Sequence, residues 1–238
     1  MGYDAKESHI EFYRRWNSLA RPYFALQLKQ FDGYVGRRIA DIGCGYGNFT
    51  DFMLDKDLYA GVDSDLELTG ELNKKYRDSS NVKFLNYDIT DEACVRELRS
   101  LNLDTVLCIN LLEHVERDAL VIERICDALP KGSALCILVP AFQFLYGTLD
   151  ALDSHYRRYT KGALSKVLSA YPLEIIKMHY FNLPGALGWF IKGRILRQKT
   201  QTDDNYHVMN ALVPLVSKIE GIVKPPVGQS LIAIGRRT

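Results

Sequence analysis

Hydrophobic residues follow two alternating patterns over the first 140 residues of this 238-residue chain. Short, continuous apolar runs are typical of buried strands, whereas apolar positions three to four residues apart are typical of helices. The runs predict strands at Arg38–Ile42, Leu58–Val62, Val82–Asn86, Thr105–Ile109 and Ala134–Val139. The segments between them predict helices at 48–55, 66–76, 92–100 and 117–129. Strands that alternate with helices predict a parallel sheet with helices on both faces.

The pattern differs at the two ends of the chain. Residues 8–30 have helical spacing interrupted by Pro22, so we expect one or two helices there. Residues 141–160 form a long, aromatic-rich connection. The elements predicted beyond it are a helix at 161–170, a strand at Leu173–Tyr180, a mostly helical segment at 182–224 with a polar loop at 200–205, and a strand at Ser230–Ile234. The predicted fold is therefore a doubly wound, mostly parallel α/β sheet of seven strands.

Charge and cysteine content narrow the class of protein. The formal net charge is +1, and this balance disfavours a nucleic-acid partner because proteins that clamp nucleic acid usually carry a basic excess. The five cysteines form no CxxC pair or His/Cys cluster with metal-ligand spacing, so we expect reduced structural thiols and no metal site. The first ten residues are polar, and no apolar run approaches the length of about 20 that spans a bilayer. We therefore expect a cytoplasmic protein without a signal peptide.

The clearest chemical signal is a glycine-rich turn after the first predicted strand, with the sequence Asp41-Ile42-Gly43-Cys44-Gly45-Tyr46-Gly47. Its glycines allow positive φ and let the backbone approach a ligand closely, and we expect it to open a helix. The dinucleotide fingerprint G-x-G-x-x-G/A is not matched, because Asn48 stands where its third small residue belongs. Asp41 would repel a pyrophosphate and attract a positively charged ligand.

Acidic residues also follow the second and third strands. Asp63 comes about 20 residues after the glycine turn, the spacing of the acidic residue that binds ribose hydroxyls, and Ser64 follows it. Asp88 can accept a hydrogen bond from an adenine amine, and Ile89 can pack on the adenine ring. The alternative for Asp88 is a cap or turn residue before the next helix.

These motifs, with Asn110-Leu111-Leu112-Glu113-His114-Val115 after the fourth strand, resemble those of class I S-adenosylmethionine-dependent methyltransferases over residues 35–140. The resemblance implies a Rossmann-like fold, S-adenosylmethionine as methyl donor and S-adenosylhomocysteine as product. It implies that Asp41, Gly43 and Gly45 line the methionine part of the donor, that Asp63 holds the ribose and Asp88 the adenine amine, and that Asn110 lies beside the donor. Residues 145–160 are similar to a stretch in a broad bacterial subgroup of small-molecule methyltransferases.

The resemblance also divides the single domain of residues 1–238. We expect residues 1–34 to form an N-terminal helical lid and residues 35–140 the donor-binding core. Residues 141–238 then supply an acceptor-side connection, a helical insertion near the C-terminus and the last strands. In the lid, Tyr13 is the residue expected to touch a ligand, and simple packing of the helix on the sheet is the alternative.

The acceptor side is predicted from residue types in the long connection. His155 follows the fifth strand among polar and aromatic residues, so we predict a general base there, with a structural hydrogen-bond network as the alternative. The residues predicted to contact the acceptor are His114, Tyr146, Tyr156 and Arg158. For Arg158, an ion pair with Asp150, Asp153 or Glu113 is the alternative. For the two tyrosines it is plain packing, and for His114 it is ordering of the loop after the fourth strand.

The expected function is therefore methyl transfer to an oxygen or nitrogen nucleophile of a small-molecule acceptor, by a monomer or homodimer. Residues 189–199 mix bulky apolar and basic side chains, which suits weak contact with an anionic membrane surface and a lipid or quinone-like acceptor. A cap over the acceptor pocket or a dimer contact is the alternative for that segment. A non-catalytic, partner-binding domain of the same fold is a further alternative. An NAD-dependent oxidoreductase is disfavoured by Asn48 and Asp41.

Overall fold

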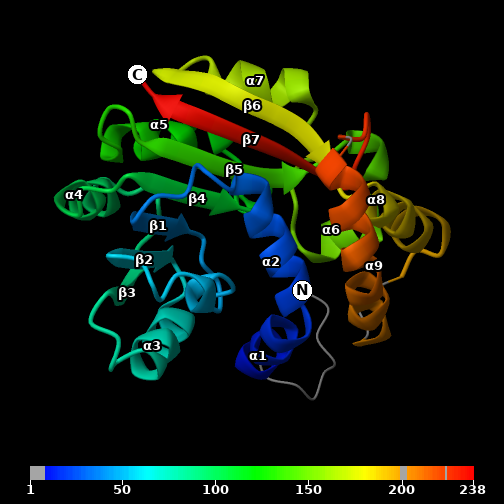
Figure 1. The fold of residues 1–238 in the computed structure, drawn as a ribbon, viewed down its shortest axis with the longest axis horizontal. Coiled ribbons are helices and arrows are strands. Elements are labelled where there is room, and N and C mark those ends of the chain that lie inside the picture. The colour runs from blue at the N-terminus through cyan, green and yellow to red at the C-terminus, as the bar shows by residue number, and fades with distance from the viewer. Residues whose placement is uncertain (1–8, 199–202, 223) are drawn as a thin grey trace.

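A seven-stranded sheet forms the centre of the computed structural model, which describes residues 9–198, 203–222 and 224–238 (Figure 1). Its strands are β1 (Arg38–Ile42), β2 (Leu58–Asp63), β3 (Val82–Asn86), β4 (Thr105–Ile109), β5 (Ala134–Pro140), β6 (Leu173–Phe181) and β7 (Ser230–Arg237). They lie in the order β3-β2-β1-β4-β5-β7-β6, and β7 is antiparallel to both of its neighbours. The other pairs are parallel. This arrangement confirms the predicted doubly wound, mostly parallel sheet.

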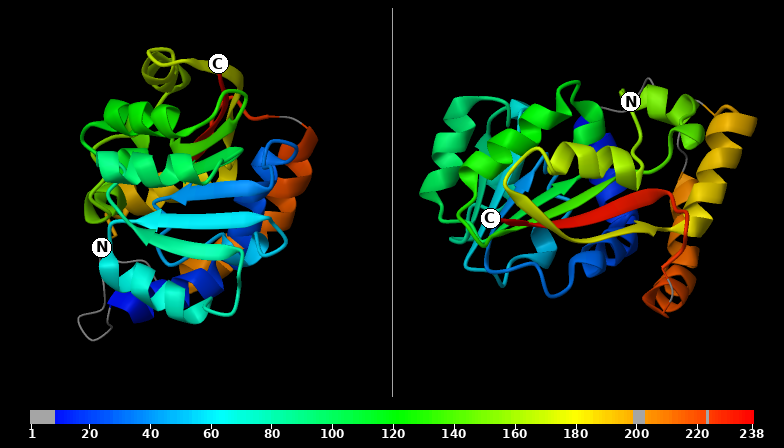
Figure 2. Two further views of the ribbon diagram at one scale, coloured as in Figure 1. Left: turned by 90° about the vertical axis from the view of Figure 1, so that its left-hand side faces the viewer. Right: turned by 90° about the horizontal axis from the view of Figure 1, so that it is seen from above.

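Helices cover both faces of the sheet (Figure 2). The helices are α1 (His9–Leu19), α2 (Arg21–Leu28), α3 (Leu66–Lys75), α4 (Glu92–Ser100), α5 (Asp118–Ala128), α6 (Thr148–Leu152), α7 (Lys161–Leu168), α8 (Leu183–Phe190) and α9 (Asp203–Ile222), with a π-helical turn at Ile191–Ile195. Apolar side chains of α4, α5 and α7 pack on one face, and those of α2, α3 and α9 pack on the other. Every residue of β4 is buried, as expected for a central strand covered on both sides.

Local sequence explains where several helices begin. Pro22 lies in the first turn of α2, where its missing N–H costs nothing, so α1 and α2 are separate as expected. Asp65 caps α3 by accepting hydrogen bonds from the backbone N–H groups of Glu67 and Leu68. Thr160 caps α7 in the same way through Ala163. Of the part of the chain that is described, no helix combines the length and hydropathy required to cross a bilayer.

The helix predicted at 48–55 is wrong. The chain there forms consecutive turns with hydrogen bonds between residues three apart, and only Thr50–Phe52 is a 3₁₀-helix. Phe49 and Met53 both insert into the core beside α2, and the run Asn-Phe-Thr-Asp-Phe has weak helix propensity. The glycine turn therefore leads into 3₁₀-type turns instead of an α-helix.

Two further predictions differ from the structure. The connection at 141–160 contains a helix of its own, α6, whose first turn is held by Asp150 accepting a hydrogen bond from the Gly147 N–H. The polar loop predicted at 200–205 is already helical at Asp203, where α9 begins, while residues 199–202 lie outside the described part.

Candidate functional site

A cavity of about 330 Å³ lies at the carboxyl ends of β1, β2 and β4. Strand order reverses between β1 and β4, and ligands of open α/β sheets bind at such a switch point. Its lining residues are Ile42, Gly43, Val62, Asp63, Ser64, Tyr87, Asp88, Ile89, Thr90, Leu111, His114, Val115 and Glu116. The charged side chains among them are all carboxylates, Asp63, Asp88 and Glu116. This charge fits a cationic donor better than a pyrophosphate, so we call this space the donor cavity.

Asp63 ties the glycine turn to the cavity. Its carboxylate accepts hydrogen bonds from the N–H of Gly45 at 2.8 Å and from the N–H of Asp65 at 3.0 Å. Gly43 comes so close to Leu111 that a Cβ on Gly43 would lie 2.9 Å from a Leu111 methyl carbon, and its φ is +75°. The structure therefore brings an acidic side chain and a bare backbone turn together, as the sequence predicted for the ribose and methionine parts of a donor.

The residues predicted for the adenine end also line the donor cavity. Ile89 is buried, and Asp88 and Ser64 are exposed at its wall. Asp88 also makes the turn expected as its alternative, because its Oδ1 accepts from both the N–H and the hydroxyl of Thr90. The turn and a ligand contact are compatible, since a carboxylate has a second oxygen.

Three of the predicted cofactor residues do not line the donor cavity. Asp41 is buried at 1% exposure, where its carboxylate accepts a 2.6 Å hydrogen bond from the Tyr59 hydroxyl. Burial raises the pKa of Asp41 to about 7. Gly45 acts through its hydrogen bond to Asp63, and Asn110 is exposed at the end of β4 with a φ of +52°. Direct contact of Asp41 with the donor is not supported by this geometry, because its side chain is turned into the core beside β2.

Helix α1 contacts the glycine turn. The Asn17 amide donates to the carbonyl oxygen of Tyr46 and to the side chain of Asn48, and Arg14 donates to the Tyr46 hydroxyl at 3.2 Å. The predicted ligand contact of Tyr13 lies outside the described residues, because only its backbone is described. The first helix is therefore hydrogen-bonded to the glycine turn.

A second group of polar side chains is built around Asp150, which is fully buried. Its carboxylate accepts hydrogen bonds from His155 Nδ1 at 2.9 Å, Arg158 Nε at 2.7 Å and Trp189 Nε1 at 2.9 Å. Burial alone would raise the pKa of Asp150, but these donors outweigh it and hold the pKa at about 2. Since the Asp150 carboxylate can only accept, Nδ1 of His155 is the donor, and in the neutral imidazole Nε2 carries the lone pair.

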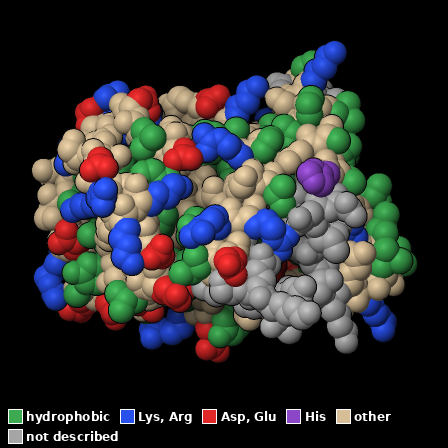
Figure 3. All heavy atoms as spheres, turned by 90° about the horizontal axis from the view of Figure 1, so that it is seen from below, with side chains coloured by type: hydrophobic (Ala, Val, Ile, Leu, Met, Phe, Trp, Pro, Cys, Tyr) green, Lys and Arg blue, Asp and Glu red, His purple; other side chains and the backbone are tan. Residues whose placement is uncertain are grey.

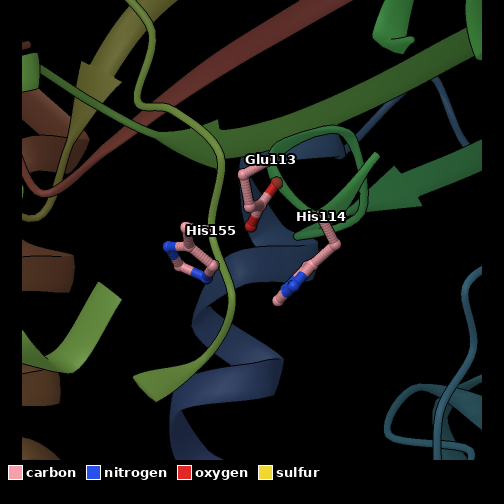
Figure 4. Close-up of side chains that lie close together, drawn as sticks. All are labelled: Glu113, His114 and His155. Atoms are coloured by element: carbon pink, nitrogen blue, oxygen red, sulfur yellow. The ribbon is translucent and has the colours of Figure 1, made fainter. Parts of the chain in front are cut away.

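His155 meets the loop after β4 in a cluster with Glu113 and His114 (Figure 4). The two imidazole rings are in edge contact, with centroids 4.6 Å apart, and one ligand-type atom from each of the three residues lies within 4.8 Å of the others. Burial lowers the pKa of His114 to about 4 and raises that of Glu113 to about 7. Metal-ligand spacing in the sequence predicted no such cluster, because its residues come from separate loops that meet only in the fold.

The remaining predicted acceptor residues have different surroundings. Arg158 is buried and committed to Asp150 and to the carbonyl oxygen of Ala141, so the expected contact with an acceptor is replaced by its alternative, an ion pair. The Tyr146 hydroxyl donates to the carbonyl oxygen of His155, which positions that residue. Tyr156 is 56% exposed and its ring lies near Arg157. Of the predicted acceptor residues, His114 is the one that lines the donor cavity.

Sequence reasoning missed several residues of the site. Tyr87 and Leu111 line the donor cavity and adjoin predicted residues, so their position beside the motifs was the available signal. Glu113 and Trp189 carry no such signal. Glu113 meets His155 only in the fold, and Trp189 reaches Asp150 from α8.

Comparison with known proteins agrees with the geometry. Residues 39–132 match the model of a methyltransferase domain family. No curated protein matches the chain by sequence. Two similar solved structures are a SAM-dependent methyltransferase from Archaeoglobus fulgidus (17% identity, 97% of this chain and 100% of that chain, TM-score 0.59) and the N-methyltransferase NodS from Bradyrhizobium japonicum with S-adenosyl-L-homocysteine (12%, 97% and 93%, 0.60). The magnesium protoporphyrin IX methyltransferase from Synechocystis is also similar (15%, 99% and 90%, 0.54). At these identities the likeness concerns the fold.

Proposed function

We propose that the chain is a class I S-adenosylmethionine-dependent methyltransferase and that it methylates an oxygen or nitrogen nucleophile of a small-molecule acceptor. One observation carries this proposal. His114 lines the donor cavity and its ring is in contact with His155, so the site for the donor and the Asp150–His155 pair adjoin. A donor and a group that can take up a proton are thus adjacent, as transfer to a protonated nucleophile requires.

The donor-binding residues are those of the donor cavity. Asp63 would accept from ribose hydroxyls, Asp88 from the adenine amine, and Ile89 would pack on the ring, with Gly43 allowing close approach of the backbone. When bound, S-adenosylmethionine supplies a methyl group on a sulfonium sulfur. A lone pair of the acceptor forms the new bond to the methyl carbon, and the electron pair of the broken C–S bond stays on sulfur. The carboxylates of the cavity would favour a ligand that carries this positive charge.

His155 would help the acceptor to lose its proton. Its Nδ1 is held by the buried Asp150, which fixes both the orientation and the tautomer of the ring. Arg158 and Trp189 hold Asp150 in turn, so the imidazole is rigidly placed. An imidazole of this kind can act on a hydroxyl or an ammonium that must be deprotonated before it attacks.

Contacts of α1 support a division of the domain into three parts. We propose that residues 1–34 form a lid, because α1 contacts the glycine turn, and that residues 35–140 bind the donor. Residues 141–238 would then shape the acceptor side.

The five cysteines are all free and buried, which supports a reducing, cytoplasmic location.

A lipid or quinone-like acceptor is the second candidate, favoured by an apolar cavity of about 130 Å³ between α2, α8 and α9. Trp189 and Leu149 line it, and Trp189 also donates to Asp150, so this cavity adjoins the His155 group. Hydrophobic side chains also gather at the edge of the molecule where α8 and α9 lie (Figure 3). An apolar tail could be accommodated here while its head group lies near His155.

Calorimetric titration of the purified protein with S-adenosylhomocysteine, and with NAD as the control ligand, tests the proposal. We expect micromolar binding of the first alone, because Asp63 and Asp88 can accept hydrogen bonds from its ribose and adenine, whereas the carboxylates of the cavity repel the pyrophosphate of NAD. A preference for NAD would contradict the donor assignment. Binding of neither would favour the non-catalytic, partner-binding alternative.

A further inference from the structure

Three metal-ligand side chains converge beside the donor cavity. Glu113 and His114 come from the loop after β4, and His155 comes from the connection after β5, which lies next to β4 in the sheet (Figure 4). One atom of each lies within 4.8 Å of the others, so small movements of these side chains would let a single ion contact all three. Two imidazoles and one carboxylate form a ligand set that suits divalent transition metals.

Glu113 supplies an independent observation. Its side chain is 1% exposed, and its Oε2 has no hydrogen-bond partner among the described atoms. Figure 4 shows its carboxylate directed toward the space between the two imidazole rings. A buried carboxylate oxygen without a partner is costly, since neither water nor a donor replaces its lost hydration. A cation in that space would supply the missing partner.

The surroundings of His155 match those of a metal-binding histidine. Such residues usually donate their other ring N–H to a carboxylate, which fixes the ring and raises its basicity as a ligand. His155 donates Nδ1–H to Asp150, whose oxygens are otherwise engaged by Arg158, Trp189 and the Gly147 N–H. The lone pair of Nε2 is therefore free to bind an ion.

We propose that Glu113, His114 and His155 bind one divalent transition-metal ion, such as Mn²⁺, Fe²⁺, Co²⁺ or Zn²⁺, that holds the acceptor through an oxygen atom. Three protein ligands leave coordination positions open, as in catalytic metal sites. The ion would lie next to the donor cavity, because His114 belongs to both. The part that concerns the acceptor rests on the proposed methyl transfer, whereas metal binding itself does not.

A metal ion at this site would restrict the acceptor to compounds that are methylated on a hydroxyl oxygen. A hydroxyl oxygen bound to a divalent ion loses its proton more readily and still has lone pairs for attack. An amine nitrogen bound to the ion has no lone pair left. In the transfer, the hydroxyl proton passes to water, the oxygen forms the new bond to the methyl carbon, and the carbon–sulfur bond breaks with its electron pair remaining on sulfur. As a ligand, His155 promotes the loss of this proton through the ion that it binds.

Metal titration of the full chain, produced without a polyhistidine tag and stripped with a chelator, tests the site. We expect one equivalent of Co²⁺ to bind, with visible absorption bands of nitrogen and oxygen ligation. The variants Glu113→Gln, His114→Gln and His155→Gln should each bind Co²⁺ at least about tenfold more weakly. His207→Gln, which changes an exposed histidine of α9, should bind as the wild type does.

Circular dichroism and titration with S-adenosylhomocysteine separate loss of the metal site from unfolding and from loss of the donor site. Circular dichroism checks folding of each variant, and the wild-type stoichiometry alone decides the question if the variants are unfolded. Failure of the wild type to bind Co²⁺, Mn²⁺ or Zn²⁺ would overturn the metal site, as would variants that bind like the wild type. S-adenosylhomocysteine titrated into the same samples separates the two proposals: its binding without metal binding removes only this inference, whereas loss of its binding removes the methyl-donor site.

Discussion

Asp63 both holds the glycine turn, through the Gly45 N–H, and lines the donor cavity. We expect Asp63→Ala to weaken S-adenosylhomocysteine binding by about 100-fold or more, since hydrogen bonds to a charged group contribute about 1.5–3 kcal/mol. Asp63→Asn keeps an acceptor for the Gly45 N–H and should lose less. Calorimetry measures both, with the exposed Asp78→Ala as the control. Affinity like that of the wild type in Asp63→Ala would remove the ribose assignment.

His155 should matter for turnover and not for donor binding. It lies outside the donor cavity, whereas its neighbour His114 lines it. We expect His155→Ala to lower the rate of methyl transfer by about 100-fold, a typical loss for a positioned proton-handling group. The affinity for S-adenosylhomocysteine should stay within about twofold of the wild type. Unchanged turnover would make the Asp150 group a purely structural network, and His207→Ala serves as the control.

His179 links the stability of the fold to pH. It is buried on β6, its Nε2 pairs with Gln30, and its Nδ1 has no partner among the described atoms. Burial, with nearby lysines, lowers the pKa of His179 to about 4, against about 6.5 in the unfolded chain. Between these values the unfolded state binds more protons, so stability is lost as pH falls from 6.5 toward 4, by at most about 3 kcal/mol from this group.

His179→Gln should therefore flatten the dependence of the unfolding free energy on pH in this window. His114, whose pKa is also lowered to about 4, leaves part of the slope in place. Denaturant unfolding at several pH values between 4 and 7 measures the difference. Parallel curves for wild type and variant would show that His179 does not titrate as its burial requires.

At the scale of elements, α1 is the segment most directly coupled to the donor motif. Asn17 holds the carbonyl oxygen of Tyr46 and the side chain of Asn48, both in or next to the glycine turn. We expect Asn17→Ala to weaken S-adenosylhomocysteine binding several-fold, because the turn loses two hydrogen bonds of about 1 kcal/mol each. Asn210→Ala is the matched control, since Asn210 bonds to the Leu19 carbonyl at the far end of α1. Equal effects of both variants would argue against a lid at this place.

Strands and helices were predictable from the sequence where hydrophobic periodicity alone decides the local structure. The buried strands and the amphipathic helices between them follow from hydrophobic periodicity, and the seven-stranded sheet followed from their order. Residues 48–55 failed because Phe49 and Met53 are drawn into the core by tertiary packing, which local spacing does not encode. Asp41 does not line the donor cavity for a similar reason, since its carboxylate accepts a hydrogen bond from Tyr59 on the neighbouring strand.

The candidate site was predictable to the extent that its residues lie within motifs. Gly43, Asp63, Ser64, Asp88 and Ile89 line the donor cavity because strand ends place them at one edge of the sheet. The partnership of Asp150 with Trp189 depends on how α8 returns to the connection after β5. Such long-range contacts have no spacing in the sequence that would indicate them.

At the scale of the whole molecule, charge and exposed apolar surface decide between the two candidate acceptors. The net charge of +1 gives no strong field over the protein, so attraction to an anionic membrane must be local. The π-helical turn and its surroundings would supply such an attraction, because Leu187, Ile195 and Leu196 are more than half exposed beside Lys192 and Arg194. Basic and apolar side chains together favour the interface of an anionic bilayer.

We expect this face to give weak sedimentation with vesicles that contain anionic lipid and none with neutral vesicles. Ile195→Ser should remove it, and Leu66→Ser, at an even more exposed apolar position on α3, should not. Half-molar salt should also abolish it, because screening shortens the reach of surface charges to a few ångströms. Binding that survives salt would mean that apolar insertion dominates, and the acceptor would then be sought among membrane lipids. Absence of binding to any vesicle would remove the membrane contact and leave the soluble small-molecule acceptor, with the apolar cavity near Trp189 as part of its pocket.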